Sequence, residues 1–300
     1  MITTELYVGQ GLGNQLWSIA ACQSFAHHAG VDFAILGSQR FKGHAFMKVD
    51  FGTKLSGSLH DGPSSELPTG VDNYFVEDKL ISPELGLETT RFDRKAFELQ
   101  PATKIDGCFQ SERYVRAVKD SIVEQFQSKN DLAMDENTCV ISFRGGEYRG
   151  IKKVLLTEEY YRNSMDVMRG IIPNVNFLVI TDDAKFAKKY FPSTPIISSR
   201  LVPHLAHFRF SPTSSQIGRD FTWIQRARYI ILSNSSFSWW GAWTNVLHPV
   251  VIGPKYWAAH NVSEREWSMG DSLTENWLWL DRHGKLWTYE DCLMELNKKM

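Results

Sequence analysis

An arginine followed by two glycines and an acid comes directly after an apolar run. The run Cys139–Phe143 has the composition of a buried strand, and Arg144–Glu147 (RGGE) follows it. A guanidinium at a strand end can hold a phosphate through two parallel N–H bonds, and the glycines remove side chains that would block a ligand. Glu147 is placed to orient Arg144 or to contact ligand hydroxyls. The alternative is a structural ion pair between Arg144 and some other carboxylate.

A second polar segment joins a short apolar run to a helix. Ser233–Gly241 (SNSSFSWWG) brings three hydroxyls and an amide, ending in Ser235 and Ser236 before Phe237, to the start of that helix. Backbone N–H groups, hydroxyls and the positive end of the helix dipole favour a phosphate there. The alternative is an N-cap with more hydroxyls than capping needs. A further strand ends in Thr181–Asp183, where Asp182 and Asp183 could accept hydrogen bonds from a base or ribose, or cap the next helix.

A third loop lies near the start of the chain. Gly9–Gly13 (GQGLG) precedes Asn14 and Gln15, but the third glycine of a dinucleotide-binding fingerprint is Asn14 here, and no acid ends the following strand. Glycines such as Gly11 and Gly13 allow close backbone approach, and the N–H groups of a helix start favour an anion or a sugar hydroxyl. The alternative is a tight turn without a ligand.

Composition excludes several classes of function. The chain has 300 residues, 33 Lys and Arg against 34 Asp and Glu, and a net charge of -1, so no global attraction to nucleic acid is expected. No D-x-D triplet, Walker loop or zinc-protease motif occurs, and the four cysteines show no C-x-x-C spacing, so no metal is expected. The charge-free stretch 229–254 carries too many polar groups to span a bilayer and reads as strand, loop, helix and strand.

The elements around these loops form two α/β runs. In the first, Glu5–Val8 and Phe33–Leu36 read as strands around a helix that ends near His28, and Ser111–Gln127 reads as one amphipathic helix. The second run alternates strands and helices from Cys139 onward. We expect a division near residue 130, with an α/β lobe over 1–130 and another over 131–300. Two such Rossmann-like lobes would place their strand-end loops around one cleft.

The ordered set of motifs resembles the α-1,2-fucosyltransferases of glycosyltransferase family 11. The similar segments are GQGLGNQL at 9–16, FQSERY at 109–114, ITDD at 180–183, SNSSFSWWGAW at 233–243 and VIGPKYW at 251–257. The resemblance implies two Rossmann-like lobes of the GT-B type, with 1–130 on the acceptor side and 131–300 binding the nucleotide sugar. It also implies GDP-fucose as the donor, a galactose 2-hydroxyl as the acceptor, inversion at the anomeric carbon and no metal requirement.

The resemblance also implies roles for single residues. Arg144 matches the first arginine of the family's H-x-R-R-x-D motif and would hold the diphosphate, with Ser235, Ser236 and Phe237 lining the phosphates. Asn14 would lie near the transferred sugar, Asp182 or Asp183 near the nucleotide, and Gly11 and Gly13 at the donor. The central motif departs from the family pattern, because Ser142, Gly145 and Glu147 stand where the family has His, Arg and Asp. Arg149, Lys152 or Lys153 could replace the missing charge, and a different GDP-sugar stays open.

The mechanism expected from these parts is a direct displacement. The leaving diphosphate gains negative charge, and Arg144 with the start of the Ser235–Phe237 helix would stabilise it. Glu147, Asp182 and Asp183 are the candidates for the general base. The rival interpretations are a protein that binds nucleotide sugars without transfer, and a metal-dependent transferase. Because no signal or anchor precedes the first strand, we expect a cytoplasmic protein, acting free or in peripheral contact with the inner face of the membrane.

Overall fold

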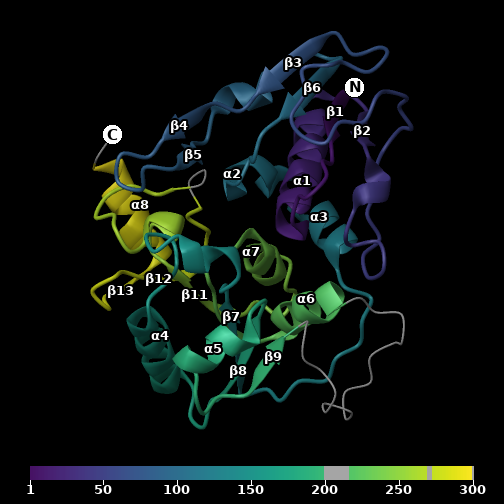
Figure 1. Ribbon diagram of the computed structural model, residues 1–300. Helices are drawn as coiled ribbons and strands as arrows, with labels where there is room; N and C mark the ends of the chain where they lie inside the picture. The colour runs from purple at the N-terminus through teal and green to yellow at the C-terminus, as the bar shows by residue number, and fades with distance from the viewer. Residues whose placement is uncertain (199–215, 269–271, 299–300) are drawn as a thin grey trace. The chain divides into compact units, whose positions relative to one another are not determined.

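The computed structural model describes residues 1–198, 216–268 and 272–298, and the chain divides into two units. The first comprises Met1–Phe126 with Ser268 and Ser272, and the second comprises most of the chain from Gln127 onward. Each unit is built on its own largely parallel sheet with helices, as the α/β prediction requires (Figure 1). The cleft between lobes and their division into acceptor and donor sides stay predictions.

The sheet of the first unit has the strand order β2-β1-β6-β3 and is parallel throughout. Its strands are β1 (Ile2–Glu5), β2 (Phe33–Leu36), β3 (Asn73–Val76) and β6 (Thr103–Asp106), and β4 (Lys79–Ile81) pairs with β5 (Glu88–Thr90) in a separate hairpin. Helix α1 (Leu12–Ala29) packs on β1 and β2 and is followed by Gly30 in the left-handed conformation that glycine tolerates best. The predicted order of strand, glycine loop, helix and strand is therefore confirmed.

The first strand lies earlier in the chain than the sequence predicts. Strand β1 ends at Glu5, whereas Glu5–Val8 was the predicted strand. The N–H of Leu6 still bonds to the carbonyl of Leu36, but the N–H of Tyr7 bonds to the side-chain oxygen of Gln10, which lies in the glycine loop. The loop's own side chain therefore replaces a neighbouring strand as the partner of Tyr7, and the strand stops.

The single helix predicted over Ser111–Gln127 is also wrong. The structure has α2 (Glu112–Val115), a 3₁₀ turn at Arg116–Val118 and α3 (Lys119–Phe126). The carbonyl of Tyr114 accepts a hydrogen bond of 2.5 Å from the hydroxyl of Ser24 on α1. This contact competes for the carbonyl that would accept the next intrahelical bond, so tertiary packing interrupts the helix. Ser111 caps α2 with its side chain, as its position at the predicted start indicates.

The second unit contains a seven-stranded sheet of order β13-β12-β11-β10-β7-β8-β9. All neighbours are parallel except the pair of β12 and β13. Its strands are β7 (Thr138–Phe143), β8 (Asn176–Thr181), β9 (Ile196–Ser198), β10 (Tyr229–Ile231), β11 (Val250–Pro254), β12 (Leu278–Leu280) and β13 (Leu286–Trp287). Its helices are α4 (Glu158–Ile171), α5 (Ala184–Tyr190), α6 (Gln216–Arg226), α7 (Ser236–Trp243) and α8 (Tyr289–Asn297).

The charge-free stretch forms β10, α7 and β11, in agreement with the sequence prediction. The indole rings of Trp239 and Trp243 stack at 5.3 Å, and Trp240 meets both rings edge-on. All three side chains are buried, so they belong to the core. No helix among the described residues combines the length and the apolar character that crossing a bilayer requires.

Candidate functional site

Three of the predicted loops leave the same edge of the second sheet. Strand β7 lies between β8 and β10, with Ile141 paired to Val179 on one side and to Ile231 on the other. All three strands run in the same direction, so their carboxyl ends lie together. The hydroxyls of Ser142 and Ser233 are 3.2 Å apart at this edge. The structure therefore brings the loops that begin at Arg144, Asp182 and Ser233 into one neighbourhood.

Arg144 is held by Asp182. One guanidinium nitrogen of Arg144 lies 2.5 Å from Oδ2 of Asp182, and Oδ1 of the same carboxylate accepts the N–H of Gly145 at 2.9 Å. Both side chains of the ion pair are partly exposed. Glu147 is 3.8 Å from Arg144 and its side chain is 86% exposed, so Asp182, rather than Glu147, orients the arginine. The sequence offered, as an alternative, a structural ion pair between Arg144 and another carboxylate. This ion pair is present with Asp182, and it leaves Arg144 partly exposed and accessible to a ligand.

The two glycines after Arg144 have a structural reason that differs from the predicted one. A Cβ atom at Gly146 would lie 2.5 Å from Oδ2 of Asp182, and one at Gly145 would lie 3.0 Å from Cβ of Asp183. A side chain at Gly146 would therefore collide with the Asp182 carboxylate, and one at Gly145 would crowd Asp183. The glycines allow the Asp182 carboxylate to reach Arg144.

Asp183 has a different environment from Asp182. Its Oδ1 accepts the N–H of Phe186 and so caps α5, and its Oδ2 lies 3.0 Å from the guanidinium of Arg149. The capping alternative for this residue is thus present in the structure. Arg149 packs over the ring of Phe186, with 4.8 Å from Cζ to the ring centroid. A second arginine therefore lies on this edge through its pair with Asp183.

The start of α7 lies beside the arginine loop. Ser235 occupies the N-cap position, but its side chain makes no capping hydrogen bond, and Ser236 and Phe237 begin the helix. The phenol of Tyr148 donates to the carbonyl of Asn234 at 3.3 Å, while Cζ of Arg144 lies 5.5 Å from the Tyr148 ring centroid. Tyr148 therefore links the arginine loop to the segment that leads into α7.

Asp220 on α6 is a candidate that the sequence did not single out. Helix α6 packs on β7, β8 and α7, and Asp220 is only 8% exposed. Its Oδ1 is buried with no hydrogen-bond partner among the described residues. The pKa of this carboxyl is raised to about 7, chiefly by burial, with Arg219 opposing the change and the nearby charge of Asp182 adding to it. The only sequence signal was one acid preceding the apolar positions of an amphipathic helix.

The glycine loop of the first unit is open at two of its glycines. No atom lies within 4 Å of a Cβ built at Gly9 or Gly11, so a ligand could approach the backbone. Gly11 is the N-cap of α1 without a side-chain cap, and Gly13 lies in the first turn. Asn14 is exposed, and its side-chain oxygen accepts from the amide of Gln110 at 3.2 Å. The structure places these residues at a helix start, as predicted, within a different unit from Arg144.

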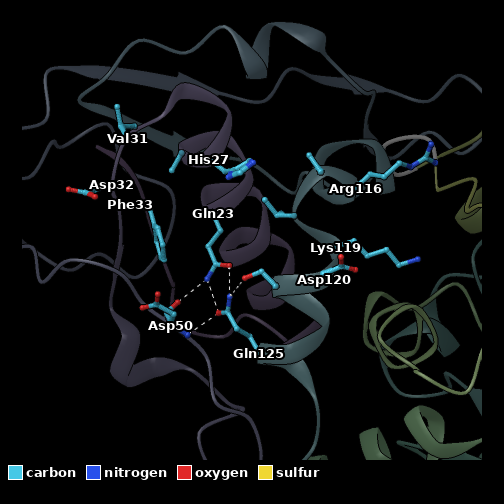
Figure 2. A pocket seen from close by; sticks show the side chains of 14 residues that line it. Gln23, His27, Val31, Asp32, Phe33, Asp50, Arg116, Lys119, Asp120 and Gln125 are labelled. Carbon is cyan, nitrogen blue, oxygen red and sulfur yellow. Dashed lines mark hydrogen bonds between the residues drawn. The ribbon is translucent and has the colours of Figure 1, made fainter.

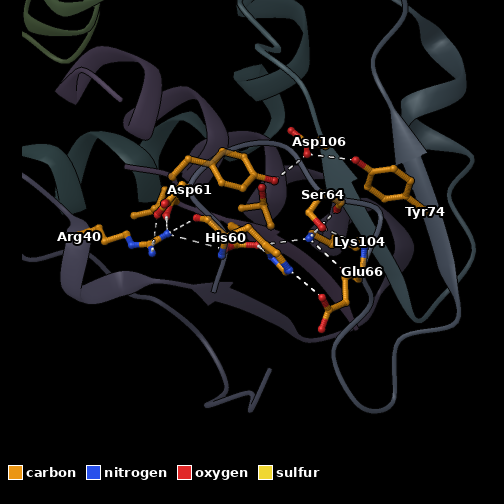
Figure 3. A network of polar contacts seen from close by, with 12 residues as sticks. Arg40, His60, Asp61, Ser64, Glu66, Tyr74, Lys104 and Asp106 are labelled. Carbon is orange, nitrogen blue, oxygen red and sulfur yellow. Dashed lines mark hydrogen bonds and ion pairs between the residues drawn. The ribbon is translucent and has the colours of Figure 1, made fainter. Parts of the chain in front are cut away.

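A buried ionic cluster lies at the end of β1 (Figure 3). The fully buried carboxylate of Glu5 is 3.3 Å from the ammonium of Lys104, 3.0 Å from Nδ1 of His60 and 3.8 Å from Arg40. Lys104 also donates to the carbonyls of Ser64 and Glu66. These bonds fasten a long connection to the sheet, so the cluster has a structural role.

A cavity of about 680 Å³ in the first unit is lined by none of the residues that the sequence predicts as site residues (Figure 2). Asp32 and Phe33, at the amino end of β2, help to line it together with residues of α1 and α3. Gln23 and Gln125 exchange amide hydrogen bonds of 3.0 Å at its wall. It therefore lies at the sheet edge opposite the carboxyl ends. Among the described residues no three His, Cys, Asp or Glu side chains gather as a metal site requires.

Comparison with known proteins shows similarity to glycosyltransferases. The family model described as glycosyl transferase family 11 matches residues 63–281. An alpha-1,2-colitosyltransferase of Escherichia coli is 24% identical over 295 residues, which cover 91% of this chain and 97% of that protein. The O-antigen biosynthesis glycosyltransferase WbnK of Escherichia coli is 24% identical over 173 residues, covering 51% and 54%. The solved fucosyltransferase NodZ from Bradyrhizobium has a TM-score of 0.42 at 14% identity, covering 95% and 97%.

Proposed function

Because the chain belongs to glycosyl transferase family 11, we propose that it is an inverting glycosyltransferase that moves L-fucose from GDP-fucose to the 2-hydroxyl of a galactoside. The observation that carries this proposal is the Arg144 guanidinium, oriented by Asp182 one strand away from the start of α7. The similarity to an alpha-1,2-colitosyltransferase supports transfer to a 2-hydroxyl. It also makes a colitosyl donor the main alternative to fucose.

In the proposed reaction the acceptor oxygen attacks the anomeric carbon while the bond from that carbon to the β-phosphate oxygen breaks. The bonding electron pair stays on the departing GDP, so negative charge grows on its diphosphate. Arg144 and the N–H groups at the start of α7, with the hydroxyls of Ser235 and Ser236, supply donors that are already oriented. Asp182 has the role of a positioning residue, because it holds the guanidinium without needing to touch the substrate.

We propose that Glu147 is the general base that removes the proton of the acceptor hydroxyl. Asp182 is engaged by Arg144 and Gly145, and Asp183 by Arg149 and Phe186, so each of these carboxylates already accepts strong bonds. Glu147 has only the 3.8 Å contact with Arg144 and is largely exposed. An exposed carboxylate without close donors can approach the acceptor hydroxyl and accept its proton. Asn14 would contact the transferred sugar, with Gly11 and Gly13 allowing its approach.

Asp220 is proposed to hold the base of the nucleotide. A buried carboxylate oxygen without a hydrogen-bond donor destabilises the folded protein. A ligand that supplies N–H groups would provide the missing hydrogen bond. Guanine offers such groups on its pairing edge, whereas an adenine in the same position offers a different pattern. This assignment gives the chain a reason to prefer GDP over other nucleoside diphosphates.

The test of the proposed function is a pair of substitutions at Arg144, assayed with GDP-fucose and a neutral galactoside by mass spectrometry. Loss of one charged partner of a phosphate costs about 1.5–3 kcal/mol, which is about tenfold to a hundredfold. We expect Arg144→Ala to lower kcat/KM by at least this factor. Arg144→Lys should recover little, because an ammonium cannot form the two parallel bonds of a guanidinium.

A near-native kcat/KM for Arg144→Lys would remove Arg144 from the phosphate role. Replacing GDP-fucose by GDP-colitose in the same assay decides between the two donors. If the chain binds GDP-sugars but releases no GDP with any galactoside, the interpretation as a binding protein without transfer activity replaces the proposal.

A further inference from the structure

Two acidic residues end adjacent parallel strands of the first unit and have opposite surroundings. Glu5 ends β1 and Asp106 ends β6. Glu5 is surrounded by basic side chains, since Lys104, His60 and Arg40 all lie within 4 Å of its carboxylate. Asp106 forms no ion pair within the described residues, although it is only 7% exposed. Lys79 interacts electrostatically with Asp106, but its ammonium forms its ion pair with Glu88, at 3.0 Å.

The partners of Asp106 are two phenols. Tyr7 donates to Oδ2 at 2.6 Å and Tyr74 donates to the same oxygen at 3.1 Å (Figure 3). Burial and the neighbouring carboxylate raise the pKa of Tyr7 well above its ordinary value and that of Tyr74 to about 12, so both phenols stay protonated donors. Oδ1 of Asp106 accepts no hydrogen bond from the described residues. One oxygen is therefore saturated by fixed donors and the other is available.

This arrangement is poorly suited to stability alone. A buried carboxylate is normally paired with a cation, as Glu5 is, because removing an unpaired charge from water is costly. Two tyrosines, which hold Asp106 in one orientation, supply hydrogen bonds but no compensating charge. The backbone N–H of Tyr7 bonds to the side chain of Gln10, so the glycine loop fixes one of the two residues that hold the carboxylate. A carboxylate flanked by aromatic rings matches the hydroxyls and apolar faces of a sugar.

We propose that Asp106, positioned by Tyr7 and Tyr74, binds hydroxyls of the acceptor sugar through Oδ1 and selects for acceptors without negative charge. The inference rests on the proposed function for calling the sugar an acceptor, but the binding site itself does not depend on transfer. An uncompensated anion repels a carboxylated sugar. The subsite therefore takes a neutral galactoside and rejects the corresponding uronide.

The test measures sugar binding directly, with the full chain and saturating GDP. Methyl β-galactoside and methyl β-galacturonide are titrated by ligand-observed NMR into the wild type, Asp106→Asn and the matched control Glu66→Gln. Glu66 is an exposed member of the neighbouring cluster, bonded to His60 at 2.9 Å. We expect Asp106→Asn to weaken galactoside binding about tenfold to a hundredfold, as loss of a charged acceptor does. The substitution should also reduce the preference over the uronide, with the affinity for GDP unchanged.

Tyr74→Phe provides a second variant that keeps the carboxylate and removes one of its two donors. It should weaken galactoside binding by a smaller factor and leave the preference for neutral sugar in place. Unchanged galactoside affinity in Asp106→Asn overturns the proposal, and so does a wild type that binds both sugars equally or neither. If galactoside binding follows the expected pattern but no GDP-sugar is consumed, the proposed transfer fails and the sugar site stands.

Discussion

Asp220→Asn should stabilise the protein at neutral and alkaline pH. The native Asp220 carboxyl is buried on α6 with an oxygen that lacks a partner, and its pKa is raised to about 7. An unfolded chain would titrate this group near its ordinary value of 3.8. Some carboxyls have a higher pKa in the folded state than in the unfolded state. The contribution of such a group to stability is fully present below the unfolded-state pKa and is lost as the pH rises through the folded-state pKa. Asparagine has nearly the same shape and no charge at any of these pH values.

The size of the effect follows from this difference in pKa. At pH 8 the native carboxylate costs the folded state up to about 4 kcal/mol, and at pH 5 less than about 2 kcal/mol. The stability gained by Asp220→Asn should therefore grow by about 2 kcal/mol between pH 5 and pH 8. Above pH 8 the gain should level off, because both the folded and the unfolded states are then ionised.

Urea unfolding of the wild type and Asp220→Asn across this pH range measures the gain directly. Asp166→Asn is the control, because Asp166 is an exposed residue of α4 whose ion pair with Arg169 lies on the surface. Its effect should be small and nearly constant with pH. A gain from Asp220→Asn that does not vary between pH 5 and pH 8 would refute the reasoning. In parallel, the variant should bind GDP more weakly than the wild type, since a neutral amide oxygen is a weaker acceptor for the base than a carboxylate.

Two further predictions concern the arginine loop and the expectation that transfer needs no metal. Gly146→Ala should lower kcat/KM for transfer about tenfold or more, because the new Cβ would displace Asp182 from Arg144; Gly150→Ala, which has nothing within 4 Å of its Cβ, is the control and should be close to wild type. Equal activities of the two variants would contradict the positioning role of Asp182. Transfer should continue at the same rate in excess EDTA, and a loss that added Mg²⁺ restores would support the metal-dependent alternative.

Local patterns were sufficient where a short segment determines its own structure. The apolar runs and the glycine loop predicted β7 and α1 within a few residues, because hydrophobic periodicity acts over one or two turns. The failures lie where a distant group intervenes. Ser24 interrupts the helix expected after Ser111, and Gln10 ends β1 early.

For the site, the sequence by itself determined which loops carry chemistry, since Arg144, Asp182 and Ser235 each follow a strand and polar residues at strand ends are readily recognised. Only the tertiary structure decided what these groups do to one another. It assigned Asp182 as the partner of Arg144, explained Gly146 by that contact, and separated Glu5 with its cations from Asp106 with its phenols. The physical reason is that ion pairing and desolvation depend on distances of a few ångströms between residues far apart in the chain. No spacing along the sequence encodes those distances.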